Sequence, residues 1–211
     1  MTIVSLKAEK TQRDGTVKAE FSDGSSLLFA TGYLPEELRG TVLEEPGREL
    51  PSGEEEAFRY AAACYRAEKA ALRLIARAEQ NSLTLTAKLE RRGYNAAVTG
   101  TVVSYLQDQN FINDRRYAEL WIRSRLTSRR VLSPRWLLVS LGKRGIDRNH
   151  SRKALAEALD PEIEYSLLLR YIEKAKPGNM KIPEAKREKF LRAQLKYEGF
   201  SLIVLERYFN N

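Results

Sequence analysis

A cluster of basic side chains is the part of this sequence whose residue types could do chemistry. Residues 113–159 contain twelve of the 36 basic side chains of the chain but only four of its 28 acidic ones. The other 24 basic and 24 acidic residues cancel, so the whole net charge of +8 lies in this segment. A local surplus of this kind is typical of proteins that bind polyanions. The alternative is a solvated basic face without a partner.

We take these twelve residues as the candidate binding residues, because a guanidinium can hold a phosphate through two hydrogen bonds. Such contacts give affinity and position but no readout of base sequence. Tyr117 and Trp121 lie among the basic residues, and core packing is the alternative role for both rings. Arg115, Glu119 and Arg123 are also spaced as an ion-pair ladder on a helix surface. The candidates are Arg115, Arg116, Arg123, Arg125, Arg129, Arg130, Arg135, Lys143, Arg144, Arg148, Arg152 and Lys153.

Three copies of one pattern indicate the elements that position these side chains. The pattern is Leu, a second Leu four residues later, then Gly and a large apolar residue, at 85–94, 137–146 and 191–200. The two leucines share one helix face, and the glycine favours the left-handed conformation that ends a helix and reverses the chain. Self-similarity at this period is typical of tandem arrays. Helix starts are expected at Asn81 or Ser82, Asn95, Asn113, Ser133 and Asp147.

The predicted fold is mostly α, with three tandem three-helix repeats in an elongated modular array. Before the repeats, residues 1–30 alternate apolar and polar side chains, and Asp14-Gly15 and Asp23-Gly24 are hairpin signals. These features predict a small β-meander. The predicted domains are 1–53, meander and connector; 54–110, repeat 1; 111–160, the basic repeat 2; and 161–211, repeat 3.

Composition argues against several classes of protein. The chain has one histidine and one cysteine, and it lacks a P-loop and a glycine-rich dinucleotide fingerprint. No apolar run approaches the roughly 18 residues of a membrane helix, and the N-terminus does not read as a signal peptide. We therefore expect a cytoplasmic protein that is not an enzyme and has no metal, no cofactor and no catalytic residues. His150 is expected to be exposed and Cys64 to be a buried, inert thiol.

The segment from Phe111 to Arg125 carries a family resemblance. It follows the pattern aromatic-apolar-Asp-Asp-x-Arg-aromatic-Ala, then Trp-hydrophobic-x-x-Arg, with Asn113 in place of the first Asp. Pro134 and the three leucine-glycine motifs also fit. In these features the chain resembles the RecX family, regulatory proteins that modulate the RecA recombinase. The resemblance covers nearly the whole chain and is densest over residues 65–159.

The resemblance implies a protein that binds the RecA nucleoprotein filament and restrains its recombinase, ATPase and coprotease activities. It places the chain in DNA repair, homologous recombination and the SOS response. The implied partners are the RecA filament and single-stranded DNA, with double-stranded DNA as a further candidate, and no membrane. We expect a monomer whose basic repeat faces DNA or an acidic strip of RecA.

The sequence departs from the family pattern at a few positions, and two other interpretations stay open. Thr84 stands where Glu is usual, Val131 and Ser133 where glycines are usual, and Trp136 where Arg is common. The chain could instead be a helix-turn-helix DNA-binding protein built on residues 137–159, although the same leucine-glycine pattern recurs in repeats with no basic surplus. It could also be an RNA-binding or ribosome-associated helical protein.

Overall fold

The computed structural model describes residues 3–8, 15–41, 52–175 and 183–210. The chain divides into two compact units, 1–112 and 113–211. The finer division into four domains remains a prediction. None of the described helices is long and apolar enough to cross a membrane.

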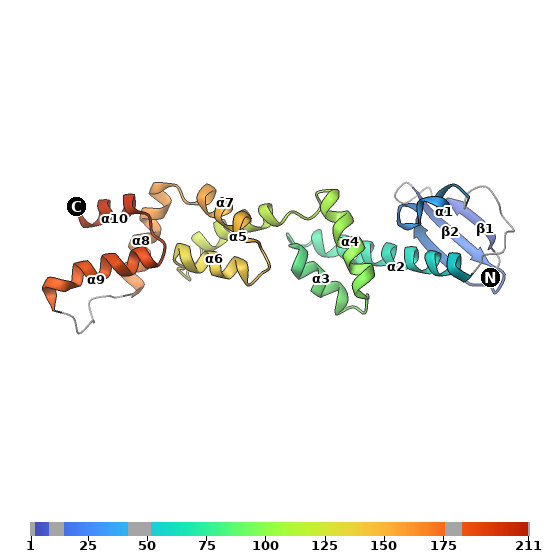
Figure 1. The fold of residues 1–211 in the computed structure, drawn as a ribbon, viewed down its shortest axis with the longest axis horizontal. Helices are drawn as coiled ribbons and strands as arrows, with labels where there is room; N and C mark the ends of the chain where they lie inside the picture. Colours follow the sequence, from blue (N-terminus) through green and yellow to red (C-terminus); the bar gives the residue numbers. More distant parts are fainter. Residues whose placement is uncertain (1–2, 9–14, 42–51, 176–182, 211) are drawn as a thin grey trace. The chain divides into compact units, whose positions relative to one another are not determined.

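The first unit begins with the small antiparallel sheet that residues 1–30 predict (Figure 1). Its strands follow one another in the order β1 (Ile3–Ala8), β2 (Thr16–Phe21) and β3 (Ser26–Ala30). Gly24 adopts the positive φ that the Asp23-Gly24 turn needs, whereas Asp14 of the other predicted turn lies outside the described residues. Buried Phe29 meets the ring of Phe58 edge-on, with 5.2 Å between ring centroids. A sheet too small to be stable by itself thus packs on a helix of the first repeat.

The described helices after the sheet form the predicted triplets, and they are preceded by η1 (Thr31–Tyr33) and α1 (Glu36–Thr41). The first repeat helix ends at Ile75, after which the N–H of Arg77 donates to the carbonyl of Leu74 in a tighter turn. The triplets are α2 (Ser52–Ile75), α3 (Ser82–Glu90) and α4 (Ala96–Asp108); α5 (Asp114–Leu126), α6 (Pro134–Gly142) and α7 (Arg148–Ala158); and α8 (Pro161–Ala175), α9 (Glu184–Tyr197) and α10 (Leu202–Phe209).

The glycine of each motif ends the middle helix of its repeat in the expected way. Gly93, Gly145 and Gly199 have φ values of +88°, +78° and +89°. In the first repeat the N–H of Tyr94 donates to the carbonyl of Leu89, and the N–H of Gly93 donates to that of Glu90. The same two bonds recur around Gly145 and Gly199, which makes each turn a Schellman motif. The large residue after each glycine is thereby brought back onto the leucine pair.

The polar residues expected at helix starts act as caps. The side chains of Asn81, Asn95 and Asn113 each accept a hydrogen bond from the backbone N–H three residues later. The Asp147 carboxylate accepts from the N–H groups of His150 and Asn149, and these bonds hold the pKa of Asp147 below its usual value. These local contacts explain why the helix starts can be read from sequence.

The second and third repeats are joined by a buried hydrogen-bonded contact. The Ser133 hydroxyl lies 2.5 Å from Oε2 of Glu198, whose side chain is also buried. The Glu198 carbonyl accepts from the N–H of Arg135 at 2.9 Å. The Arg135 guanidinium covers the ring of Tyr197, 4.1 Å from its centroid. The start of α6 is therefore held by the end of α9.

Replacing Gly199 with alanine should weaken this junction by about 1–2 kcal/mol, because an L-residue is strained at positive φ. A Cβ at this position would also lie 3.2 Å from the backbone nitrogen of Arg135. Both tryptophans of the chain, Trp121 and Trp136, lie in repeat 2. We therefore expect Gly199→Ala to lower the urea midpoint of the tryptophan fluorescence transition.

Gly93→Ala is the matched control, since it has nearly the same φ but no atom within 4 Å of the added Cβ. It should leave the tryptophan transition unchanged and affect only the first unit. An equal drop of the midpoint in both variants would contradict a specific contact between Gly199 and α6.

Candidate nucleic-acid interface

Repeat 2 positions its basic residues around a compact core. The buried core residues come from all three helices and the turn before α7: Ala118, Ile122, Leu137, Leu141, Ile146, Ala154 and Ala158. Successive residues of a helix turn by about 100°, so the short helix α6 presents three faces. Leu137 and Leu141 form the inner face. The two outer faces line two separate grooves.

The first groove, here called the aromatic groove, lies between the end of α5, the loop before α6 and one face of α6. Its volume is about 480 Å³. It brings together two tryptophans and four cationic side chains, and none of its lining residues is acidic. The lining consists of Trp121, Arg125, Arg130, Val131, Leu132, Trp136, Ser140, Lys143 and Arg144.

Trp121 organises the cations on one side of the aromatic groove. The guanidinium of Arg144 lies 4.6 Å from the centroid of its ring and that of Arg125 lies 5.4 Å away. Arg144 also donates to the Ser140 carbonyl at 2.9 Å. These contacts hold two positive charges in place before any ligand arrives, so less conformational entropy is lost on binding. Trp121 is half-buried against the repeat core and also lines the groove.

Trp136 is more exposed to solvent than Trp121. Its side chain is 44% exposed, although its ring lines the groove. Arg130 and Lys143 are exposed nearby and form no ion pair with a described residue. An exposed indole flanked by cations is the combination that stacks nucleic-acid bases while holding the backbone phosphates.

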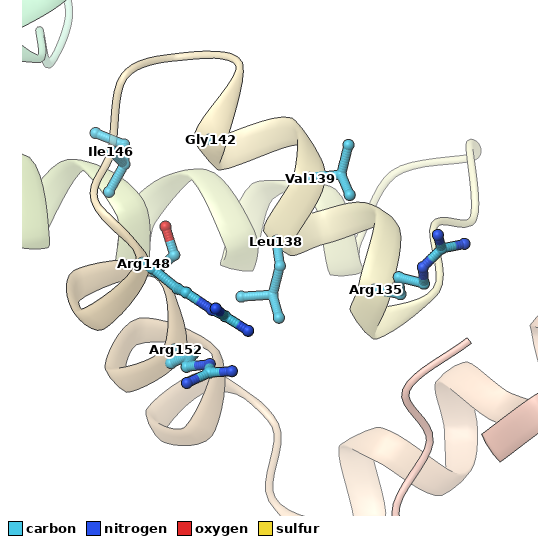
Figure 2. Close-up of a pocket in the computed structure, with 8 residues that line it drawn as sticks. Arg135, Leu138, Val139, Gly142, Ile146, Arg148 and Arg152 are labelled. Atoms are coloured by element: carbon cyan, nitrogen blue, oxygen red, sulfur yellow. The ribbon is translucent and has the colours of Figure 1, made fainter. Parts of the chain in front are cut away.

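The second groove, here called the α6–α7 groove, lies on another face of α6 and has a volume of about 370 Å³. Figure 2 shows Leu138 pointing from α6 toward the guanidinium groups of Arg148 and Arg152 on α7. The lining consists of Arg135, Leu138, Val139, Gly142, Ile146, Arg148, Ser151 and Arg152. Seven of the twelve candidate residues therefore line one groove or the other.

The remaining candidates line neither groove. Arg115 pairs with Glu119 at 3.0 Å, as the ladder spacing predicts, and with Glu157 of α7 at 2.6 Å. The hydrogen bond that Arg115 donates to Glu119, together with the charges of the Glu157 and Glu119 carboxylates, raises the pKa of Arg115. Arg115 therefore links α5 to α7. Arg116 is half-buried, whereas the other three are exposed: Arg123, Arg129 and Lys153.

Repeat 3 contributes cations that sequence reasoning missed. Arg170 donates to the carbonyls of Leu126 and Ser128, at 2.5 and 2.6 Å. Lys174, one helical turn later, donates to the carbonyl of Arg129. These two side chains hold the loop that forms one wall of the aromatic groove. Their i, i+4 spacing was visible in the sequence, but their carbonyl acceptors have no sequence signal.

The described residues contain no group of three or more His, Cys, Asp or Glu side chains arranged to hold a metal ion. His150 is exposed, as expected, and contacts Asp147. Cys64 is fully buried, and burial raises the pKa of its thiol. The predicted exposure of His150 and the predicted burial of Cys64 are confirmed.

Comparison with known proteins agrees with the resemblance. The family model described as RecX, second three-helix domain, matches residues 113–155. The regulatory protein RecX of Treponema pallidum is 36% identical over 115 residues, covering 54% of this chain and 70% of that protein. The regulatory protein RecX of Caldanaerobacter subterraneus is 26% identical over 169 residues, covering 79% and 80%. A crystal structure of regulatory protein RecX has the same fold, with a TM-score of 0.71, 20% identity and coverage of 100% of this chain and 99% of that one.

Proposed function

The chain belongs to the RecX family of regulatory proteins, and from this membership we propose that it binds the RecA nucleoprotein filament and restrains its recombinase, ATPase and coprotease activities. RecA enters as the partner through the family. The observation that carries the contact to DNA is the aromatic groove of repeat 2. In this proposal the chain acts in the cytoplasm as a monomer, by binding and not by catalysis.

The groove chemistry supports a contact that does not depend on base sequence. Arg125, Arg130, Lys143 and Arg144 can engage phosphates, and Trp136 can stack on any base because every base has a π-face. Phosphate contacts of this kind position a protein without reading bases. Such a site suits a filament that assembles along single-stranded DNA of any sequence.

The repeat organisation supports the same proposal. Tandem repeats present successive, similarly built surfaces, which suits contact with a polymer of repeating subunits. Within the proposal repeats 2 and 3, two of the four sequence-defined domains, have separate roles. Repeat 2 supplies the charged contacts, and repeat 3 holds the loop and the start of α6 that shape its grooves.

The test is the rate of ATP hydrolysis by RecA on single-stranded DNA, with the protein added below one copy per RecA. We expect inhibition at substoichiometric amounts, because a regulator bound within a filament affects more than one subunit. Added salt should weaken the inhibition steeply if phosphates contribute. Unchanged ATP hydrolysis at equimolar protein, together with tight binding to DNA or RNA alone, would contradict RecA as the partner.

A further inference from the structure

The α6–α7 groove differs in chemistry from the aromatic groove, although α6 borders both. Its apolar surface is aliphatic, formed by Leu138, Val139 and Ile146. Val139 is 37% exposed, which is high for a valine beside a packed core. No aromatic ring lines this groove, so it offers no surface on which a base could stack.

Two arginines flank this aliphatic surface. Arg148 and Arg152 are one helical turn apart on α7, are exposed, and form no ion pair with a described residue. The third lining arginine, Arg135, is already placed over the ring of Tyr197. None of the lining residues is acidic. The groove therefore has a positive edge with no negative charge of its own.

Two further features of the α6–α7 groove favour ligand binding: open space at Gly142 and a buried hydroxyl without a hydrogen-bond partner at Ser151. A Cβ on Gly142 would meet no atom within 4 Å, so the backbone there is open to close approach. The hydroxyl of Ser151 is buried in the lining and has no hydrogen-bond partner among the described residues. A buried polar group without a partner costs free energy, which a polar group of a ligand could recover.

We propose that the α6–α7 groove binds a segment of the protein partner that carries a bulky apolar side chain with carboxylates beside it. The aliphatic surface takes the apolar side chain, and Arg148 and Arg152 pair with the carboxylates. Apolar centres bordered by arginine are typical of protein–protein contacts. This assignment rests on the proposed function, so the segment belongs to RecA, while the aromatic groove contacts the DNA of the same filament.

A nucleic acid is the competing occupant, and the lining argues against it. Phosphates alone would be satisfied by the two arginines but would leave Leu138 and Val139 exposed to water. An apolar side chain removes that surface from water, which is favourable roughly in proportion to the apolar area buried. The combination of charge and aliphatic surface therefore favours a polypeptide.

Gly142→Phe tests the proposal, because it fills the groove without changing the net charge. We expect this variant to inhibit RecA ATP hydrolysis about tenfold less effectively than the original chain. It should bind a fluorescein-labelled oligothymidylate, in the absence of RecA, within about twofold of the original chain. Gly100→Phe is the matched control, since Gly100 is exposed in α4 and also has open space at its Cβ. It should leave both measurements unchanged.

A second variant, in which Arg148 and Arg152 are replaced, tests the same proposal if Gly142→Phe does not fold. Replacing Arg148 and Arg152 with glutamine should reduce inhibition more than replacing Lys189 and Lys196, two exposed lysines of α9. The proposal is overturned if the groove variants inhibit RecA as strongly as the unsubstituted protein does. It is also overturned if the variants lose oligothymidylate binding to the same extent as they lose inhibition. Failure of the proposed function itself would be visible separately, as absence of inhibition by the original chain.

Discussion

The double variant Arg130→Glu, Lys143→Glu should bind single-stranded DNA about a hundredfold more weakly at low salt, on the estimate of about tenfold for each lost contact. Both side chains are exposed in the aromatic groove and form no ion pair with a described residue. Reversal therefore removes two phosphate contacts and adds two repulsive charges without breaking an internal contact. Inhibition of the RecA filament should weaken in parallel.

The measurement is quenching of tryptophan fluorescence by oligothymidylate over a series of salt concentrations. Trp121 and Trp136, the only tryptophans of the chain, both line the groove, so their fluorescence reports its occupation directly. Loss of two phosphate contacts should reduce the slope of log K against log salt by about 1.4 for a single strand.

The control is the double variant Lys189→Glu, Lys196→Glu, which makes the same change in net charge on exposed positions of α9. It should reduce affinity only slightly. An equal loss in both double variants would show that overall charge, and not the aromatic groove, determines binding.

The structure also changes which residues should be substituted. From sequence, reversing Arg125, Arg129 and Arg130 is the natural test of the basic surface. In the structure, however, Arg125 lies against Trp121 and its Nε atom is buried. Reversing Arg125 would thus disturb packing as well as charge, whereas reversal of the exposed Arg130 and Lys143 changes the charge alone.

The variant Ser133→Ala should destabilise the unit 113–211 by about 2–4 kcal/mol. The Ser133 hydroxyl accepts from the N–H of Trp136 at 3.3 Å and caps α6. The same hydroxyl donates to the buried carboxylate of Glu198. Alanine removes the cap, worth about 1 kcal/mol, and leaves the carboxylate without this donor, which costs about 1–3 kcal/mol more. Urea denaturation followed by tryptophan fluorescence measures the loss.

A double-mutant cycle with Glu198→Gln separates the two contributions. In the Ser133→Ala background, Glu198→Gln should recover part of the lost stability, because a neutral amide is less costly to bury than an unmatched carboxylate. In the original background the same substitution should be destabilising or neutral. Equal effects of Glu198→Gln in both backgrounds would mean that the two side chains are not coupled, and that Ser133 acts only as a helix cap.

Much of the fold follows from local sequence, because the features that specify it act over a few residues. Gly93, Gly145 and Gly199 adopt a positive φ, which is favourable mainly for glycine. The three helix ends could therefore be predicted from the positions of these glycines. Asn81, Asn95 and Asn113 cap their helices through hydrogen bonds to backbone three residues away. The leucine pairs likewise predict the inner face of each middle helix, because residues four apart lie on the same face.

The candidate site could be predicted only in part from the sequence, because contacts between residues far apart in the chain decide which basic side chains lie together. The sequence determined that the positive charge belongs to repeat 2, and it named the twelve basic residues. Only the tertiary structure shows that four of them line the aromatic groove and three line the α6–α7 groove. It also shows that Arg115 links α5 to α7 through Glu157. Glu198 lies 65 residues from the Ser133 hydroxyl that it accepts from, and no periodicity connects them. Helical spacing fixes which side chains share a face, whereas the packing of one repeat on another decides what that face meets.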